Sequence, residues 1–270
     1  MSKTFADGIL EGQVAFVTGG GTGITGGVAR ALAEAGANVA LVSRGLEHLE
    51  PAAKAINEAR AVRGGTPALP GEAFAITADV RNPEDVQRAI ADTVERFGKI
   101  DIVVNGAAGN FLCKPEELSP NGFGTVVDID LKGTFNVCRA AFEQLKEHRG
   151  QILNISATLH YLGTPMQLHV SAAKAGVDAL TRNLAVEWGR YGIRANAIAP
   201  GPIEDTEGMK RLVPEPIKEK LRQRVPLGRF GLIKDIEAAA VFLCSDAASY
   251  INGAVLVVDG GHWLAANRLL

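Results

Sequence analysis

The sequence predicts an α/β protein with one doubly wound, parallel sheet that carries helices on both faces. The first observation is a strand, a glycine-rich turn, a helix and a second strand within residues 13–44. The second is that short apolar runs alternate with helical repeats along the rest of the chain. The third is composition: with 270 residues, 47% hydrophobic and 21% charged, the chain can bury one large core. Residues 1–270 are therefore expected to form a single domain.

Residues 14–18 form the first predicted strand. The run Val-Ala-Phe-Val at 14–17 is too short for a helix and suits a strand buried on both faces. After it, Ile24, Val28 and Leu32 recur every four positions, so one face of a helix over 24–35 is expected to pack on the sheet, and Gly36 ends that helix. Residues 38–43 form the second strand, parallel to the first because a helix joins the two.

The turn between the first strand and its helix is built from glycines. They are Gly19, Gly20, Gly21 and Gly23. Because they lack side chains, the backbone can approach a pyrophosphate while N–H groups at the helix terminus face the anion. A tight turn alone would give the same glycines, but both strands and the helix are in register with it. The unit therefore predicts a nucleotide bound to a Rossmann fold.

The end of the second strand indicates which nucleotide binds. An acidic residue there would accept hydrogen bonds from the ribose 2′-OH of NAD. This chain has Ser43 and Arg44 instead, and a hydroxyl and a guanidinium suit a 2′-phosphate. The sequence therefore favours NADP(H) as the cofactor.

Charge and cysteine content exclude several classes of protein. The net charge of −2 gives no bulk attraction to nucleic acid or to membrane surfaces. Cys113, Cys138 and Cys244 show neither disulfide nor metal-site spacing, so we expect buried thiols and no metal. No apolar run approaches the roughly 18–20 residues of a membrane span. The last residues, 267–270, are not a Ser-Lys-Leu type peroxisomal signal, so the cytoplasm is the expected compartment.

Five further strands are expected, which makes seven in the sheet. They cover residues 73–78, 100–104, 151–156, 194–199 and 254–258, with helices over 46–62, 83 onwards, 119–148, 171–189 and 235–243. Asp79 follows the third strand, where it could accept a hydrogen bond from an adenine amine or be a solvated loop residue. After the fourth strand, small residues from Asn105 to Gly109 again let the backbone contact a ligand.

The segment from 204 to 226 differs from the rest because six lysines and arginines lie between residues 206 and 224. Such a charged helical insert is usually a solvated surface, but over a crevice it could be a lid for a polyanionic substrate. We therefore regard residues 204–226 as a candidate substrate lid.

Over almost its whole length the chain resembles the short-chain dehydrogenases/reductases. The matching motifs are TGxxxGI (18–24), DV (79–80), NGAAG (105–109), SAAKAG (171–176), NAIAPG (196–201), NG (252–253) and VDGG (258–261). One departure is that the third glycine position of the family holds Thr25, with Gly26 next, which puts helix packing near the turn in doubt.

A second departure concerns proton transfer. Family members that reduce carbonyls hold a Tyr four residues before the Lys, where this chain has Val170 before Lys174. The family's Ser aligns with Ala157 and its helix Asn with Asp130. Valine cannot transfer a proton, so alcohol or ketone chemistry by the usual route is not expected.

This combination resembles the peroxisomal-type 2,4-dienoyl-CoA reductases. The shared stretches are AAGNFL (107–112), DID (128–130), GTFNV (133–137), ATL (157–159), LAVEWG (184–189), APGPI (199–203) and TEG (206–208). The resemblance implies NADPH-dependent reduction of a 2,4-dienoyl-CoA to a 3-enoyl-CoA in unsaturated fatty-acid β-oxidation. It also implies that Asp130 and Lys174 are the catalytic pair. A satisfied helix carboxylate is the alternative for Asp130, and His160, Tyr161 and His169 are rival proton donors.

The resemblance also assigns binding residues. For the nucleotide they are Gly19, Gly20, Gly21, Thr22, Gly23, Ile24, Ser43, Arg44, Asp79, Val80, Asn105, Ala107, Lys174, Pro200, Gly201, Pro202, Ile203 and Thr206. For the acyl-CoA substrate they are Arg81, Phe111, Ser119, Asn121 and Arg211, with Phe111 walling the acyl slot. A homotetramer packed through the two long helices is expected of the family.

Two other functions stay open. One is a different short-chain reductase or dehydrogenase, acting on a 3-oxoacyl, sugar or alcohol substrate with Tyr161 or a histidine as proton donor. The other is a protein that binds NADP(H) without turnover, which the loss of the family Tyr favours. Lys174 and the AAGNF stretch favour dienoyl chemistry over both.

Overall fold

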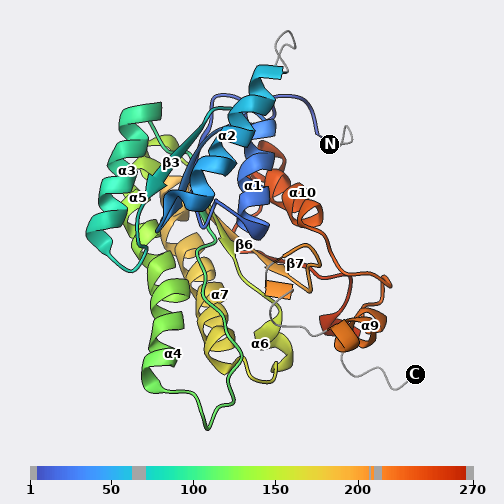
Figure 1. Cartoon of the computed structure of the whole chain (residues 1–270). Coiled ribbons are helices and arrows are strands. Elements are labelled where there is room, and N and C mark those ends of the chain that lie inside the picture. The colour runs from blue at the N-terminus through green and yellow to red at the C-terminus, as the bar shows by residue number, and fades with distance from the viewer. Residues whose placement is uncertain (1–4, 63–70, 207, 210–214, 266–270) are drawn as a thin grey trace.

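A computed structural model describes residues 5–62, 71–206, 208–209 and 215–265 of the chain. Within these ranges seven strands form one parallel sheet in the order β3-β2-β1-β4-β5-β6-β7 (Figure 1). The strands are β1 (Val14–Thr18), β2 (Asn38–Ser43), β3 (Ala73–Thr77), β4 (Ile102–Asn105), β5 (Gln151–Ile155), β6 (Arg194–Pro200) and β7 (Val255–Val258). The predicted seven-stranded, doubly wound α/β fold is confirmed.

Helices connect the strands and cover both faces of the sheet. In chain order they are α1 (Gly23–Glu34), α2 (Leu46–Val62), α3 (Pro83–Phe97), α4 (Pro120–Val127), α5 (Gly133–His148), α6 (Leu159–Leu162), α7 (Leu168–Trp188), α9 (Glu215–Gln223) and α10 (Ile233–Leu243). Helix α7 begins three residues before the predicted Ser171, and the short helix α6 was not predicted.

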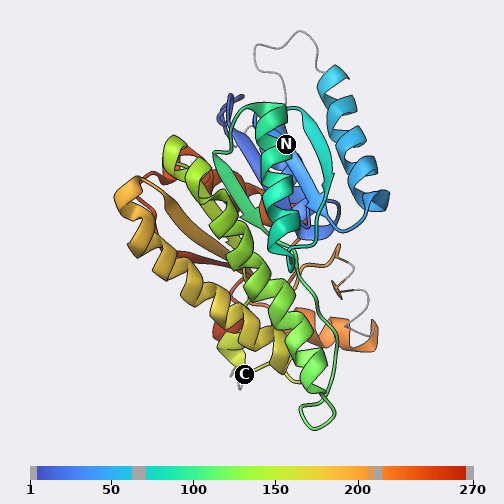
Figure 2. The ribbon, with the colours of Figure 1, turned by 90° about the vertical axis from the view of Figure 1, so that its left-hand side faces the viewer.

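Strand β1 shows how the sheet is buried on both faces. Ala15 and Val17 face the core formed with α1, α2 and α10, whereas Phe16 faces the core formed with α3, α5 and α7. Figure 2 shows α3, α5 and α7 side by side across their face of the sheet. Burying a side chain such as Phe16, which is completely inaccessible, contributes about 1.5–3 kcal/mol to folding. The apolar run at 14–17 is therefore explained by two cores rather than one.

The helix predicted over 119–148 is not one regular α-helix. Ser119 caps α4 by accepting a hydrogen bond from the Gly122 N–H at 3.0 Å. Between α4 and α5, residues Asp128–Lys132 form a π-helical turn. A π turn holds an extra residue, so the side chains after it are rotated relative to a regular helix, and such turns are frequent at functional sites. Asp130 lies in this turn, completely buried, and the turn packs against α7.

Two of the three cysteines are buried thiols, as predicted. Burial raises the pKa of Cys138 and of Cys244 to about 12, while Cys113 is half-buried and all three are unpaired. Within the described part of the chain no helix has both the length and the apolar character needed to cross a membrane. The described residues also contain no group of three or more histidine, cysteine or acidic side chains arranged to hold a metal ion.

Candidate active site

A cleft of about 550 Å³ lies at the carboxyl ends of β1 to β4. The sheet order reverses here, because β1 lies between β2 and β4, and ligands of open α/β sheets bind at such a point. The cleft is lined by Gly19, Gly21, Thr22, Thr25, Val42, Ser43, Arg44, Gly45, Glu47, His48, Ala78, Asp79, Val80, Gly106, Ala107, Ala108 and Ile129. It therefore brings together the predicted glycine turn, the end of β2 and the segments after β3 and β4.

The glycine turn fits a phosphate-bearing nucleotide because neighbouring parts of the chain lie too close to it to leave room for side chains. Gly19 has a φ of +69°, and a Cβ added to it would lie 2.8 Å from the carbonyl oxygen of Gly106. A Cβ on Gly21 would lie 3.0 Å from the Cβ of His48. Side chains at either position would fill the cradle in which backbone N–H groups could face an anion.

The departure at Thr25 has a structural role. Its Oγ1 donates a hydrogen bond to the carbonyl oxygen of Gly106 at 3.4 Å, which joins α1 to the loop after β4. On the other side of that loop, the Oγ1 of Thr18 accepts hydrogen bonds from the N–H groups of Gly106 and Ala107. Helix α1 is thus held at the cleft without the family's third glycine.

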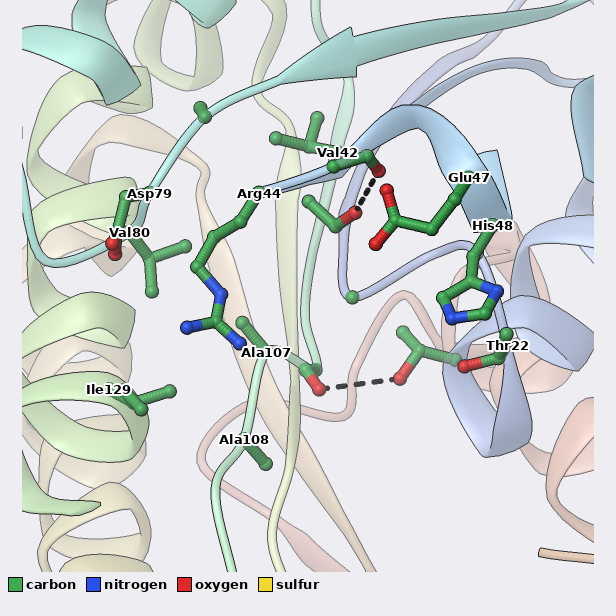
Figure 3. A pocket seen from close by; sticks show the side chains of 17 residues that line it. Thr22, Val42, Arg44, Glu47, His48, Asp79, Val80, Ala107, Ala108 and Ile129 are labelled. Atoms are coloured by element: carbon green, nitrogen blue, oxygen red, sulfur yellow. Dashed lines mark hydrogen bonds between the residues drawn. The ribbon is translucent and has the colours of Figure 1, made fainter. Parts of the chain in front are cut away.

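At the end of β2, Arg44 is exposed and its guanidinium reaches into the cleft (Figure 3). The Ser43 hydroxyl donates a hydrogen bond to the carbonyl oxygen of Gly45, so it also stabilises the turn into α2. The sequence analysis missed Glu47 and His48, which line the cleft from the first turn of α2. Their position in the sequence, directly after the turn that follows β2, could have identified them as cleft residues.

Asp79 and Arg81 pair with each other. The Arg81 guanidinium donates to both carboxylate oxygens at 2.5–3.0 Å, and this hydrogen bonding lowers the pKa of Asp79. Asp79 lines the cleft as predicted for a nucleotide contact, while Val80 beside it is buried. Arg81, predicted to contact acyl-CoA, is exposed and does not itself line the cleft.

Asn105, a predicted nucleotide contact, does not line the cleft. Its Nδ2 donates to Asn154 Oδ1 at 2.9 Å and lies 3.3 Å from the sulfur of Cys138, so the side chain is in the core. These contacts fix the ends of β4 and β5 relative to each other. Ala107, two residues on, lines the cleft.

Asp130 and Lys174, the predicted catalytic pair, lie together beneath the loop after β4. Asp130 Oδ1 accepts a hydrogen bond from the Gly109 N–H at 2.7 Å, and Oδ2 lies 3.2 Å from the Lys174 Nζ. Lys174 Nζ also donates to the carbonyl oxygen of Ile155 at 2.9 Å, and its side chain is 7% exposed. Asp130 Oδ2 receives no hydrogen bond from any described residue, and the Lys174 ammonium is its close polar neighbour.

Val170, at the place of the family's tyrosine, is buried with Val126 and Ala173. Next to it, His169 is completely buried and stacks on Phe111 with ring centroids 4.3 Å apart. Burial lowers the pKa of His169 below its usual value, so the imidazole is neutral near pH 7. A neutral, buried ring packed on Phe111 is a packing residue in this arrangement.

A second cavity, of about 310 Å³, lies at the ends of β5 and β6. It is lined by Ile24, Asn110, Ser156, Ala157, Thr158, Leu159, Leu162, Thr164, Gln167, Pro200, Gly201, Pro202, Ile203, Thr206, Gly208, Met209, Leu221 and His262. The predicted loop from Pro200 to Thr206 is thus part of its wall. Met209 and Leu221, two described residues of the predicted insert, also line it.

Several predicted substrate residues lie elsewhere. Phe111, Ser119 and Asn121 line neither cavity: Phe111 packs on His169, and the other two are exposed at the start of α4. Arg211 lies outside the described residues. Four lining residues were not predicted: Leu159, Leu162, Gln167 and His262. The first two lie on α6, which is too short to show a helical repeat in the sequence, and the other two lie outside the helices and strands.

The rival proton donors His160 and Tyr161 both face one carboxylate, that of Asp178. His160 Nε2 lies 2.9 Å from Oδ2, and the Tyr161 hydroxyl donates to the same oxygen at 3.1 Å. Burial, with the charge of Asp178, raises the pKa of Tyr161 to about 12. A phenol with this pKa that already donates to a carboxylate is a weak acid at neutral pH.

Comparisons with known proteins agree with this geometry. The family model described as Enoyl-(Acyl carrier protein) reductase matches residues 19–262. The chain is 50% identical to a Saccharomyces cerevisiae protein named peroxisomal 2,4-dienoyl-CoA reductase ((3E)-enoyl-CoA-producing), over 94% of this chain and 85% of that protein. An Arabidopsis thaliana protein of the same name is 47% identical over 100% of this chain and 91% of its own length.

Among solved structures, a short chain dehydrogenase from Bacillus anthracis is 42% identical with a TM-score of 0.80, covering 93% of this chain and 96% of that one. The family match extends from the glycine turn to His262 and so includes both cavities. The chain belongs to the short-chain dehydrogenase/reductase family, within the group that the Enoyl-(Acyl carrier protein) reductase model describes.

Proposed function

We propose that this protein reduces 2,4-dienoyl-CoA thioesters to 3-enoyl-CoA thioesters with NADPH, as a step in the β-oxidation of unsaturated fatty acids. The observation that carries the proposal is the buried Asp130–Lys174 pair, 3.2 Å apart, in a site where Val170 replaces the usual phenol donor. A carbonyl reductase must protonate an alkoxide, whereas reduction of a conjugated diene forms no alkoxide. The names of the relatives in yeast and Arabidopsis support the same chemistry.

The chemistry divides between the cofactor and the protein. NADPH, when bound in the cleft, supplies a hydride to the far carbon of the diene. Negative charge then spreads to the thioester oxygen, where the Lys174 ammonium provides the compensating positive charge. Asp130 holds the proton source, either on its own carboxyl group or on a water hydrogen-bonded to Oδ2. That proton enters the carbon next to the carbonyl, so one hydride and one proton yield the 3-enoyl thioester.

A parallel assay tests the proposal. NADPH oxidation is measured with 2,4-hexadienoyl-CoA, with a 3-oxoacyl-CoA and with a simple ketone. We expect turnover of the dienoyl-CoA alone. Faster turnover of the 3-oxoacyl-CoA would point to the ordinary carbonyl reaction, and no turnover of any substrate would favour a protein that only binds NADP(H).

The cofactor is proposed to be NADP(H), with Arg44 binding the 2′-phosphate. Arg44→Ala is expected to weaken NADPH binding by ~1.5–3 kcal/mol, the size of a hydrogen bond to a charged group, and to leave NADH binding unchanged. Fluorescence titration with both nucleotides measures this. The matched control is Arg88→Ala, because Arg88 is also exposed and near the cleft but already pairs with Asp85 at 2.8 Å. Equal losses in both variants would mean that only the general positive field was removed.

The second cavity is proposed to hold the acyl chain beside the nicotinamide, with residues 204–226 as a lid. The apolar side chains of Ile203, Met209 and Leu221 line it, which suits a hydrocarbon chain. Arg81, Phe111, Ser119 and Asn121 remain proposed contacts for more distant parts of the CoA ester. Arg81, Ser119 and Asn121 are exposed, Phe111 is half-buried against His169, and none of the four lines the second cavity.

We also propose a homotetramer that packs through α5 and α7. Exposed small and apolar residues follow one side of α7. They are Leu168, Ala172, Ala175, Ala179 and Val186. Phe135 on α5 is 51% exposed, and burial of such a surface in a second copy would be favourable.

Ala179→Arg is expected to dissociate this assembly, because it places an unpaired charge in the proposed interface. Sedimentation equilibrium measures the mass, with Ala91→Arg, an exposed alanine on α3, as the control. An unchanged mass for Ala179→Arg would exclude this face.

The compartment is proposed to be the cytoplasm, although the yeast and Arabidopsis relatives are named peroxisomal. Fractionation of the host cell decides between the two compartments.

A further inference from the structure

The carboxylate of Asp178 contacts three polar side chains beside the second cavity. Asp178 lies on α7 one turn after Lys174 and is 2% exposed. Its Oδ1 accepts a hydrogen bond from the Ser156 hydroxyl at 2.5 Å. Its Oδ2 lies 2.9 Å from His160 Nε2 and accepts a hydrogen bond from the Tyr161 hydroxyl at 3.1 Å. These four side chains form a buried cluster, and none of them takes part in the proposed reaction.

Asp178 is charged at neutral pH. Burial raises its pKa, but the hydrogen bonds from His160 and Ser156 outweigh burial and bring the pKa below its ordinary value. A buried carboxylate of this kind persists only while its partners stay in place, because an unpaired charge in the interior is strongly unfavourable. The contacts with Asp178 therefore also hold its three partner side chains in place.

Two of those partners belong to α6, which needs external support. The helix has four residues, and its N-cap, Thr158, makes no side-chain capping hydrogen bond. So short a helix is not stable by its own backbone hydrogen bonds. While His160 and Tyr161 face Asp178, Leu159 and Leu162 of the same helix line the second cavity. The hydrogen bonds on one side of α6 thus determine where its apolar side lies.

We propose that Asp178 is a positioning residue that fixes the α6 wall of the second cavity and thereby sets the affinity for the acyl chain. The inference rests on the proposed function, since that function assigns the cavity to the acyl group. Asp178 is also on the same helix as Lys174, so the wall is held in register with the group that stabilises the thioester oxygen. The nucleotide cleft shares none of these residues.

The test is Asp178→Asn, which keeps the size of the side chain but removes its charge. The KM for 2,4-hexadienoyl-CoA is expected to rise about tenfold, the scale of losing one hydrogen bond to a charged group. The KM for NADPH and kcat are expected to stay within about threefold, because neither depends on the wall. The matched control is Glu237→Gln on α10, a carboxylate that is also buried but pairs with Arg30 away from both cavities.

A second variant separates positioning from general destabilisation. Tyr161→Phe removes one partner and is expected to raise the same KM about threefold in the wild type and not at all in the Asp178→Asn background, because both changes act through one cluster. A parallel loss of kcat and NADPH affinity in Asp178→Asn would mean that the role is only structural. Should Asp178→Asn not fold, Tyr161→Phe alone decides, and an unchanged KM overturns the inference.

Failure of the proposed function is distinguishable from failure of this inference. If the wild type does not reduce dienoyl-CoA, the proposed function fails. The inference is then tested by calorimetric titration of hexanoyl-CoA, a saturated ester that needs no turnover. The Kd is expected to rise about tenfold in Asp178→Asn. Equal Kd values for wild type and variant overturn the inference whatever the enzyme's reaction.

Discussion

Asp130→Asn is expected to lower kcat for a 2,4-dienoyl-CoA by roughly 10²- to 10⁴-fold, the range for losing general acid–base catalysis. Asparagine keeps the shape and can still accept the hydrogen bond from Gly109, but it cannot hold or deliver the proton. NADPH binding is expected to change little, because Asp130 does not line the cleft. Steady-state kinetics across pH, with NADPH titration alongside, measure both effects.

The matched control for this variant is Asp128→Asn. Asp128 lies on the same π-helical turn but is 42% exposed and pairs with Lys132 at 2.8 Å. The Asp128→Asn variant should retain full activity. If Asp130→Asn is as active as the wild type, or if Tyr161→Phe alone abolishes turnover, the proton source is not on this helix and the carbonyl-reductase interpretation returns.

Lys174→Met is expected to abolish most activity and to lower the free energy of unfolding by ~3–5 kcal/mol, because it leaves the buried Asp130 charge without a partner. The loss of activity follows from the missing positive charge at the thioester oxygen. NADPH binding is expected to weaken too, because Lys174 is also a predicted nucleotide contact. Chemical denaturation measures the unfolding free energy, single-turnover kinetics the activity, and fluorescence titration the NADPH binding.

The double variant Asp130→Asn with Lys174→Met separates stability from catalysis. With both charges gone, the unfolding free energy should recover toward the wild type, while activity stays lost. Lys132→Met, which breaks the exposed pair with Asp128, is the control and should cost no more than about 1 kcal/mol. If the double variant is as unstable as Lys174→Met, the buried pair is not the source of the instability.

The sheet could be predicted from the sequence because its strands are continuous apolar runs. The run at 14–17 needs two buried faces, and the helices that cover them share the same sequence pattern of apolar repeats. The glycine turn was predictable for a related reason: Gly19 has a positive φ and a neighbour 2.8 Å from any added Cβ, so only glycine fits.

Other features depend on contacts that no local pattern shows. The π turn at Asp128–Lys132 adds one residue to a helix whose apolar repeat is otherwise regular, so the sequence predicted an uninterrupted helix. Helix α6 contacts Asp178, which lies eighteen residues after His160 in the sequence. Arg81, a predicted substrate residue, pairs with Asp79, which lines the cleft. None of these features follows from local propensity alone.

Product analysis in D₂O tests most directly the claim that the site reduces a diene with a proton from the Asp130–Lys174 pair. The enzyme is incubated with NADPH and 2,4-hexadienoyl-CoA in D₂O, and the product is examined by mass spectrometry and proton NMR. We expect 3-hexenoyl-CoA with a single deuterium on the carbon next to the thioester carbonyl. A 2-enoyl product deuterated at the fourth carbon, or an unchanged dienoyl-CoA alongside rapid reduction of a 3-oxoacyl-CoA, would contradict it.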